Sequence, residues 1–470
     1  MERSEEFIRY MSHIGSVVGR SERRELLKGY CQGLMLPLKR KSVEPLAASI
    51  DPLHVSSMHQ SLNHFVAQSP WSDEAVLKQV TDWVLPRMSL SKKSTVFWIA
   101  DDSGMPKQGT HSVGVARQYC GQLGKTDNCQ VAVTLSVASH EASLPVKYRL
   151  YLPESWASDP VRRKETGVPD DVVFATKPAI SLAQMNAAKE AGLPGDIALA
   201  DAGYGDDTGY RDGITALGMR YAVGIKTGTK VWAPGTAPLP PKRWSGKGRK
   251  PTLLRRGPQN QPVTVKDLAL SLPASAWRKT TWREGSNTSL SSRFAAVRVR
   301  AAHGDTQATA LRADEWLLIE WPKGEPEPTK YFLSTLAATT TRKELVNVVK
   351  MRWRIERDYQ ELKQEFGLDN FEGRNWRGFH HHATLCIAAY GFLVGERLTH
   401  GNAGKKNRAV REEPSLPDDY IPRGAGSTST SCRGFDHDPA LGDRPRTRSA
   451  AHDLPMLRSG FAGQTTCLTQ

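Results

Sequence analysis

The order of secondary-structure patterns between residues 95 and 225 restricts the fold of this chain more than any other feature. Short apolar or alternating runs, rich in β-branched and aromatic residues, predict strands at Thr95–Ala100, Gln130–Ser139, Val146–Leu152, Asp196–Ala200 and Tyr221–Ile225. Apolar residues at helical spacing predict helices at Ala179–Ala191 and Tyr210–Leu217. Three strands, a helix, a strand, a helix and a strand indicate an α/β core.

Different patterns flank this segment. Apolar spacing predicts helices in the first 90 residues, over Arg342–Phe366 and over Phe379–Leu398, and strands at Phe294–Ala301, Trp316–Trp321 and Tyr331–Leu336. The end of the chain is rich in Gly, Pro, Ser, Arg and Asp, which predicts a disordered tail and is consistent with a frameshifted end. We therefore expect a helical N-terminal domain (1–90), the first part of the core (91–226), a β-rich insertion (227–330), the second part of the core (331–400) and the tail (401–470).

Basic residues outnumber acidic ones, 64 to 49, and the formal charge is +15. This excess favours a polyanionic partner over a role in solubility alone. The stretch Lys242–Arg256 holds seven basic residues and no acidic one, in a Gly- and Pro-containing loop of the insertion. The N-terminal helices are also basic, and they are either a DNA-contacting domain or a scaffold with solvated basic faces.

The six cysteines are scattered and never form a CxxC pair. This spacing predicts neither a disulfide framework nor a zinc knuckle, and it fits a reducing cytosol. The charged N-terminus lacks the apolar region of a secretory signal, and Ala383–Val394 is too short and polar to cross a bilayer. We expect a cytoplasmic protein without a membrane partner.

Aspartates follow two of the predicted strands. Asp101 and Asp102 come directly after Thr95–Ala100, and Asp201 comes directly after Asp196–Ala200, before a Gly-containing turn. Carboxylates at strand ends, with one more on a facing helix, are an economical way to hold two divalent ions for phosphodiester chemistry. Taken alone, each Asp is better explained as a helix cap or a turn residue than as a metal ligand.

A third carboxylate, Glu356, lies in the helix predicted over Arg342–Phe366. At 100° per residue, Arg352, Glu356 and Lys363 share one face of this helix, next to its apolar stripe. Glu356 is therefore at the border of the buried face, where a metal ligand is expected. The alternative is an ordinary salt-bridged helix surface.

The chain resembles the insertion-sequence DDE transposases of the seven-oh-one family, relatives of the insertion-sequence four family. The resemblance covers residues 20 to 398 and is carried by specific motifs, namely IADDSGMPKQG from Ile99, HSVGVARQYCG from His111, LADAGYG from Leu199 and WRIERDYQELK from Trp353. Arg352, Glu356 and Lys363 match the Tyr-x2-Arg-x3-Glu-x6-Lys signature of the relatives, but Val349 stands at its Tyr position.

The resemblance implies an RNase H-like catalytic core and a transposase that cleaves DNA at the ends of its element and transfers the strands. It implies Asp101, Asp201 and Glu356 as catalytic residues holding two Mg²⁺ or Mn²⁺ ions, with Asp102 as the alternative to Asp101. The implied phosphate contacts are Arg352 and Lys363, and Arg374 is a further candidate for DNA contact. Lys107, His111 and Arg117, in the basic loop after Asp101, either contact the DNA end or are solvated loop residues. The implied partners are double-stranded DNA, as terminal inverted repeats and as target, and a second copy of the chain in a dimer that pairs two ends. The expected location is the cytoplasm, on the nucleoid.

Two other functions are weighed against this one. A transposase-derived protein that binds DNA without cutting it would account for Val349 and the altered tail. A generic RNase H-like nuclease is disfavoured by the basic insertion and the N-terminal helices. The run His380-His381-His382 is expected to serve in packing or in contact with the DNA backbone rather than as a metal site, because adjacent side chains on a helix point in different directions.

Overall fold

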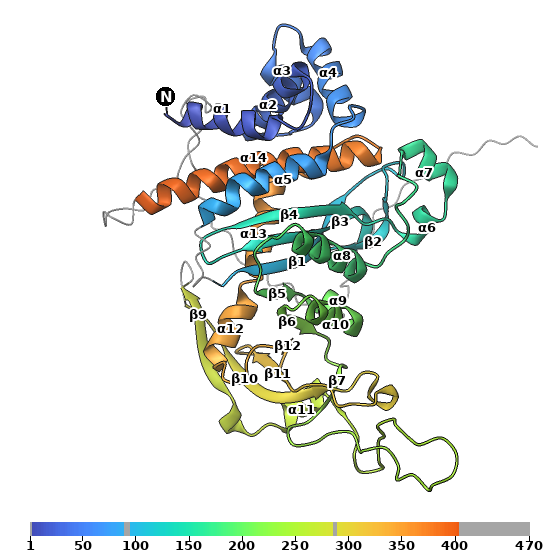
Figure 1. The fold of residues 1–470 in the computed structure, drawn as a ribbon. Coiled ribbons are helices and arrows are strands. Elements are labelled where there is room, and N and C mark those ends of the chain that lie inside the picture. The colour runs from blue at the N-terminus through green and yellow to red at the C-terminus, as the bar shows by residue number, and fades with distance from the viewer. Residues whose placement is uncertain (1, 89–94, 285–288, 404–470) are drawn as a thin grey trace, which may run out of the picture. The chain divides into compact units, whose positions relative to one another are not determined.

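The computed structural model describes residues 2–88, 95–284 and 289–403. The predicted disordered tail lies outside these residues, except for its first three positions. The described part of the chain is a mixed α/β structure in which helices flank a large sheet (Figure 1).

The N-terminal segment is helical, as predicted. Its helices are α1 (Glu2–Gly15), α2 (Ser21–Met35), α3 (Val43–Ile50), α4 (Val55–Ala67) and α5 (Asp73–Val84). They pack on the long helix α14 (Trp376–Ala403), which lies beside α5 (Figure 1). Tyr10 in α1 donates a hydrogen bond to the Ala388 carbonyl in α14 (2.7 Å), so the contact joins chain positions almost 380 residues apart.

The strands expected between residues 95 and 225 are present. They are β1 (Phe97–Pro106), β2 (Ala116–Cys120), β3 (Lys125–Ala138), β4 (Ser143–Leu150), β5 (Ile197–Ala200) and β6 (Arg220–Ile225). The spatial order is β4–β3–β1–β5–β6. The pairs β4–β3 and β3–β1 are antiparallel, whereas the pairs β1–β5 and β5–β6 are parallel. β2 forms a hairpin with β3.

Helices cover both faces of this sheet. The intervening helices are α6 (Glu154–Ala157), α7 (Pro160–Thr166), α8 (Lys177–Glu190), α9 (Ala202–Gly205) and α10 (Thr208–Ala216). Ile99 and Leu199 pack on one face, in the same apolar cluster as Ile355 of the helix α13 (Trp353–Gln364). Alternate strand residues such as Trp98 and Ala198 point to the other face, toward α8 and α10, because side chains alternate along a strand.

The first strand is longer than expected. The prediction that it ends at Ala100 was wrong, because β1 continues through Asp101 and Asp102 to Pro106. The antiparallel partner β3 pairs with every residue of this extension, up to Pro106 opposite Cys129. The polar residues interrupt the apolar run but not the backbone ladder, so Asp101 lies in mid-strand.

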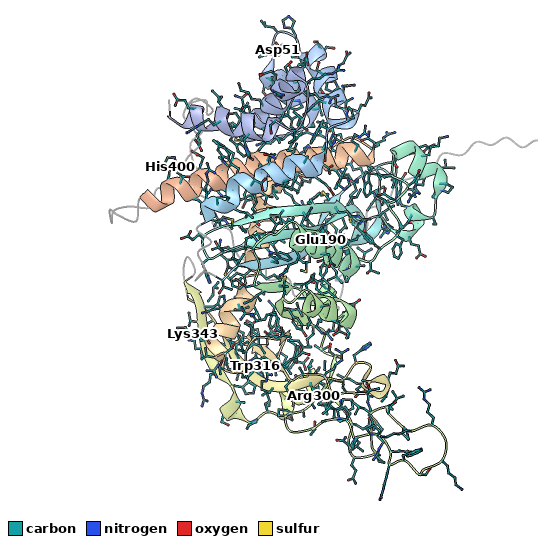
Figure 2. All side chains as sticks on the ribbon, viewed as in Figure 1. Asp51, Glu190, Arg300, Trp316, Lys343 and His400 are labelled. Carbon is teal, nitrogen blue, oxygen red and sulfur yellow. The ribbon has the colours of Figure 1, made fainter. Side chains whose placement is uncertain are left out.

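The insertion continues the same sheet. Its elements are β7 (Lys230–Trp232), β8 (Val263–Thr264), α11 (Val265–Ser271), β9 (Arg278–Glu284), β10 (Ser289–Ala301) and β11 (Glu315–Trp321). β12 (Lys330–Ser334) pairs antiparallel with β6 and joins β11 and β10 to the core strands. The basic stretch from Lys242 forms a loop whose side chains project outward, and residues 242–250 are exposed (Figure 2).

The helix predicted over Arg342–Phe366 is divided. It forms α12 (Arg342–Lys350) and α13, with a tight turn at Met351 and Arg352. The Met351 and Arg352 amides donate to carbonyls only three residues earlier, at 3.1 and 3.4 Å, so the backbone is tightened there without any Pro or Gly. Arg352 thus becomes the residue that precedes α13.

Candidate active site

Asp101 lies within β1, and Asp201 directly follows the neighbouring parallel strand β5, at the start of α9. The β1–β5 ladder pairs Phe97 with Ile197 and Ile99 with Leu199, a constant offset of one hundred residues. Asp101 and Asp201 each come two positions after the last of these pairs, and alternation along β1 directs Asp101 to the face that α13 covers. Asp101 is 9% exposed, so its carboxylate is held within the protein.

Arg352 connects this pair to Glu356. Its guanidinium donates to Asp101 Oδ2 at 2.7 Å and to Glu356 Oε1 at 2.6 Å. The side chain of Glu356 is 59% exposed, so the cluster of Asp101, Arg352 and Glu356 is open to solvent at Glu356. Two of the three predicted carboxylates therefore contact a single arginine at the start of α13, and the charge of the third, Asp201, also acts on it.

The electrostatics of the cluster reflect an excess of negative charge. Burial is the main cause that raises the pKa of Asp101 to about 7; Arg352 acts against this rise, and the charge of Asp201 adds to it. Burial acts to lower the pKa of Arg352, but the carboxylates of Asp101, Glu356 and Asp201 raise it above its ordinary value. One guanidinium faces three carboxylates, which leaves the cluster suited to further positive charge.

The donor set fits hard divalent cations, which prefer carboxylate oxygens. Arg352 occupies the position of a cation between Asp101 and Glu356. Within residues 2–88, 95–284 and 289–403, no three carboxylate, imidazole or thiolate side chains are grouped closely enough to hold a metal ion together. Binding of an ion by all three carboxylates therefore requires Arg352 to release its contacts.

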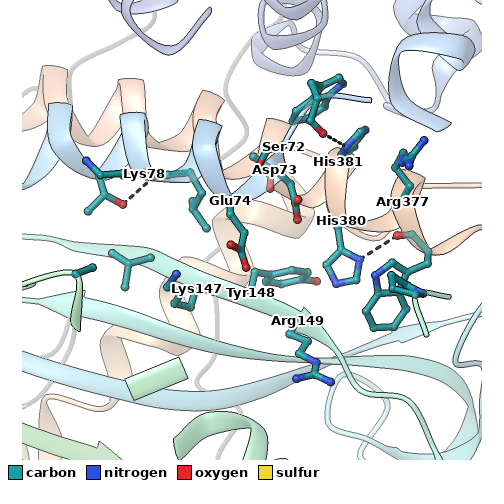
Figure 3. Close-up of a pocket in the computed structure, with 18 of the residues that line it drawn as sticks. Ser72, Asp73, Glu74, Lys78, Lys147, Tyr148, Arg149, Arg377, His380 and His381 are labelled. Atoms are coloured by element: carbon teal, nitrogen blue, oxygen red, sulfur yellow. Dashed lines mark hydrogen bonds between the residues drawn. The ribbon is translucent and has the colours of Figure 1, made fainter. Parts of the chain in front are cut away.

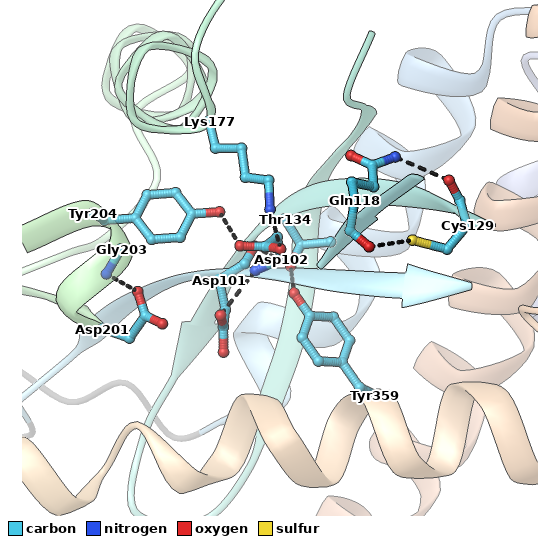
Figure 4. Close-up of polar contacts among 10 residues, drawn as sticks. All are labelled: Asp101, Asp102, Gln118, Cys129, Thr134, Lys177, Asp201, Gly203, Tyr204 and Tyr359. Atoms are coloured by element: carbon cyan, nitrogen blue, oxygen red, sulfur yellow. Dashed lines mark hydrogen bonds and ion pairs between the residues drawn. The ribbon is translucent and has the colours of Figure 1, made fainter. Parts of the chain in front are cut away.

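Asp102 points to the opposite face of the sheet (Figure 4). Its Oδ2 pairs with Lys177 Nζ at the start of α8 (2.7 Å), and its Oδ1 accepts a hydrogen bond from the Tyr204 hydroxyl in α9 (3.1 Å). Of the two aspartates that the sequence left open, Asp101 is the one on the side of Arg352 and Glu356. The sequence analysis missed Lys177 and Tyr204, although the position of Tyr204 three residues after Asp201 was a usable signal.

Thr134 and Tyr359 connect α13 to the sheet next to Asp101. Thr134 lies directly opposite Asp101 in the β1–β3 ladder, and its hydroxyl is hydrogen-bonded to the Tyr359 hydroxyl (Figure 4). Tyr359 lies three residues after Glu356 on α13 and packs in the same apolar cluster as Ile99. This contact fixes the helix that carries Glu356 over the strand that carries Asp101.

Two glycines allow α9, which begins after Asp201, to lie directly on β6. A Cβ added at Gly205 would be 2.2 Å from the Gly224 carbonyl oxygen, and one added at Gly224 would be 2.8 Å from the Ala202 amide nitrogen. These neighbours are backbone atoms, which cannot rotate away. Gly205 in the motif after Asp201 is thus explained by close packing.

We expect Gly205→Ala to lower the free energy of unfolding by about 1–3 kcal/mol, because the added methyl group must push α9 away from β6. Urea unfolding followed by circular dichroism measures this loss. Gly228→Ala is the control, since a Cβ at Gly228 has no atom within 4 Å. Equal stability of the two variants would contradict the packing argument.

The predicted DNA-contact residues differ in their surroundings. Lys363 Nζ donates to the Gly104 carbonyl at 2.7 Å and to Gln122 Oε1 at 3.2 Å, and burial lowers its pKa. Lys107 Nζ donates to the Phe371 carbonyl at 2.7 Å, and burial lowers its pKa as well. In contrast, exposed side chains are found at His111, at Arg117 in β2 and at Arg374. Contact of these residues with DNA stays a prediction.

The three consecutive histidines serve in packing. All three are buried, and they lie in α14 where the N-terminal helices meet it. His382 bonds to the Tyr30 hydroxyl (2.9 Å) and the Gly367 carbonyl (3.0 Å), and burial lowers the pKa of His382 to about 4. His381 stacks on Trp71, with ring centroids 3.6 Å apart.

A pocket of about 510 Å³ lies between α5, β4 and α14 (Figure 3). Its walls carry charges of both signs, including Asp73, Glu74, Lys147, Arg149 and Arg377. The carboxylate cluster around Arg352 does not contribute to its lining. The pocket is therefore a separate feature of the surface.

Residues 12–289 match the family described as DDE superfamily endonuclease. This match covers more than half of the chain, and the chain belongs to this family. It includes Asp101 and Asp201 and ends before Glu356.

A relative of the chain is the probable transposase for insertion sequence element IS701 of Microchaete diplosiphon, which is 28% identical over 196 residues. The similarity spans 42% of this chain and 47% of the relative, less than half of each. Within the described residues, no helix has both the length and the apolar character needed to cross a membrane.

Proposed function

We propose that this chain is a DDE transposase that cuts DNA at the ends of an insertion sequence and joins the freed ends to target DNA. The main support is the cluster in which Arg352 contacts both Asp101 and Glu356, while Asp201 follows the strand next to β1 and its charge acts on Asp101 and Arg352. Membership of the endonuclease family and the name of the relative support the same reaction class.

The proposed catalytic core is RNase H-like. The supporting observation is the strand order β4–β3–β1–β5–β6. Strands β4, β3 and β1 are mutually antiparallel neighbours, and β5 and β6 then run parallel to β1. Helix α8 connects β4 to β5, and α9 and α10 connect β5 to β6. In this arrangement the middle of β1 and the end of β5 bring their aspartates to one side of the sheet.

Asp101, Asp201 and Glu356 would hold two Mg²⁺ or Mn²⁺ ions, which activate the attacking oxygen and stabilise the leaving oxygen in phosphodiester chemistry. The protein itself supplies the remaining functions. Arg352 forms ion pairs with Asp101 and Glu356 in the absence of metal and would turn to a backbone phosphate, which its planar guanidinium binds in two places. Lys363, on the same face of α13, would provide a point charge for a neighbouring phosphate.

Double-stranded DNA is the proposed partner, first as the terminal repeats and then as the target. The overall charge of +15 and the exposed basic loop of residues 242–250 support this partner. Pairing of two ends requires two active sites, so we propose a dimer that works on chromosomal DNA in the cytoplasm.

Cleavage of a labelled DNA fragment that carries one end of the encoding insertion sequence tests the proposal. We expect cleavage by the full chain with Mg²⁺, none in EDTA, and none with Asp201→Asn at any Mg²⁺ concentration. Cleavage by Asp201→Asn at the wild-type rate would overturn the proposed site.

A non-catalytic, transposase-derived DNA-binding protein is the second candidate. The observation in its favour is that Arg352 already forms ion pairs with both Asp101 and Glu356, so the cluster holds a cation of its own without a metal. Tight binding of the end fragment by the wild-type chain, without cleavage in Mg²⁺ or Mn²⁺, would favour this candidate over the transposase.

A further inference from the structure

Asp102 links two helices to the strand that carries Asp101. Its carboxylate is paired with Lys177 Nζ at 2.7 Å and accepts a hydrogen bond from the Tyr204 hydroxyl at 3.1 Å (Figure 4). Tyr204 is 1% exposed, and Asp102 and Lys177 are mostly covered, with side chains 23% and 28% exposed. This contact lies directly behind the face on which Asp101 and Asp201 lie.

The sheet ladder alone does not fix the distance between Asp101 and Asp201. The paired residues of β1 and β5 end at Ile99 and Leu199, two positions before the aspartates. Beyond this point β1 continues along β3, whereas the chain after β5 turns into α9. The two carboxylates therefore lie where the strands separate.

Asp201 is fixed to α9 instead. Its Oδ1 accepts a hydrogen bond from the Gly203 amide (2.8 Å), and its carbonyl accepts one from the Gly205 amide (2.8 Å). Tyr204, between these glycines, is the residue of α9 that reaches back to β1 through Asp102. Asp101 and Asp201 are thus connected through the chain to Asp102, the Tyr204–Asp102 hydrogen bond and the start of α9.

We propose that Asp102 is a positioning residue which, through Tyr204, sets the spacing of the Asp101 and Asp201 carboxylates for divalent-ion binding. This inference rests on the proposed function. Lys177 holds the second oxygen of Asp102, so that the carboxylate keeps one orientation toward Tyr204. Groups that orient metal ligands from outside the coordination sphere commonly change metal affinity by about 10- to 100-fold when they are removed.

The test is Mn²⁺ binding by the full chain without DNA, followed by electron paramagnetic resonance. We expect Tyr204→Phe and Asp102→Ala to weaken Mn²⁺ binding by about tenfold or more and to alter the spectrum of the bound ions. Asp102→Asn is expected to have a smaller effect, because the amide oxygen still accepts the Tyr204 hydrogen bond.

Asp305→Asn is the matched control. Asp305 is likewise a largely buried carboxylate with one cationic and one neutral donor, Arg256 at 2.8 Å and Trp232 at 2.9 Å, but it belongs to the insertion. We expect this variant to lose thermal stability without any change in Mn²⁺ affinity. Tyr204→Phe, which removes a single oxygen atom, keeps the comparison valid if Asp102→Ala does not fold.

The outcomes separate the inference from the proposed function. If wild type and Asp201→Asn do not differ in Mn²⁺ binding, the proposed metal site itself fails, and the inference with it. Wild-type affinity in Tyr204→Phe and Asp102→Ala would overturn the positioning role alone. Loss of binding in both Asp102 variants, with wild-type affinity in Tyr204→Phe, would also overturn it and would make Asp102 a ligand.

Discussion

Glu356→Gln is expected to lower the rate of DNA end cleavage by roughly 10³-fold or more, while the fold and the affinity for DNA remain. The amide is neutral and a much weaker ligand for a divalent ion than the carboxylate. The side chain of Glu356 is 59% exposed, and its ion pair is with Arg352, which keeps its second contact with Asp101. The substitution therefore removes a proposed metal ligand without opening the core.

Single-turnover cleavage of a labelled end fragment and a gel-shift titration measure the two effects separately. Glu365→Gln is the control, because Glu365 is an exposed acid at the C-terminal end of the same helix. We expect it to cleave like the wild type. A Glu356→Gln variant that cuts as fast as Glu365→Gln would exclude Glu356 from the reaction.

Asp101→Asn is expected to make the metal-free protein more stable at pH 8 and to abolish its stabilisation by Mn²⁺. The pKa of Asp101 is raised to about 7 in the folded protein, mainly by burial, against about 3.9 in an unfolded chain. The folded state therefore binds more protons between these values, and its stability falls as the pH rises from about 4 to about 7. Asn carries no charge and avoids this cost.

Thermal unfolding in EDTA at pH 5 and pH 8 measures the effect as a rise in the melting temperature of the variant over that of the wild type. The gain should be larger at pH 8 than at pH 5. Asp127→Asn is a control in which stability at pH 8 should change in the opposite direction. A hydrogen bond from Lys125 lowers the pKa of Asp127, so loss of this charge should make the protein less stable. A less stable Asp101→Asn protein at pH 8 would mean that the Arg352 ion pair outweighs the burial of the charge.

Much of the core could be predicted from the sequence because its signals are local. The strand before Asp201 is a pure apolar run, and the helices at α8 and α10 follow apolar spacing, so their positions were predicted within a few residues. The β1 strand was predicted too short, because its continuation through Asp101, Asp102 and Ser103 is determined by pairing with distant β3 residues. The residue types of Asp101, Asp102 and Ser103 do not indicate this backbone pairing.

The candidate site was predicted in part for the same reason. Shared helical periodicity identified Arg352 and Glu356, and their contact at 2.6 Å is that of neighbours on a helix. The contact of Arg352 with Asp101 spans 251 positions in the chain and depends on how α13 crosses the sheet. The opposite directions of Asp101 and Asp102 follow from alternation in a strand, which became apparent only once both were known to lie within β1.

The buried histidines of α14 determine whether the N-terminal helices can be removed from the rest of the protein. His381 and His382 form hydrogen bonds to residues of the N-terminal segment, Val66 and Tyr30, and the apolar side of α14 packs against the same helices. Deletion of the first 88 residues would therefore expose a hydrophobic helix and leave the His381 ring without its two carbonyl partners, Val66 and Trp71. A truncated catalytic fragment, or an isolated N-terminal fragment for DNA-binding assays, would aggregate rather than report on the activity of the intact chain.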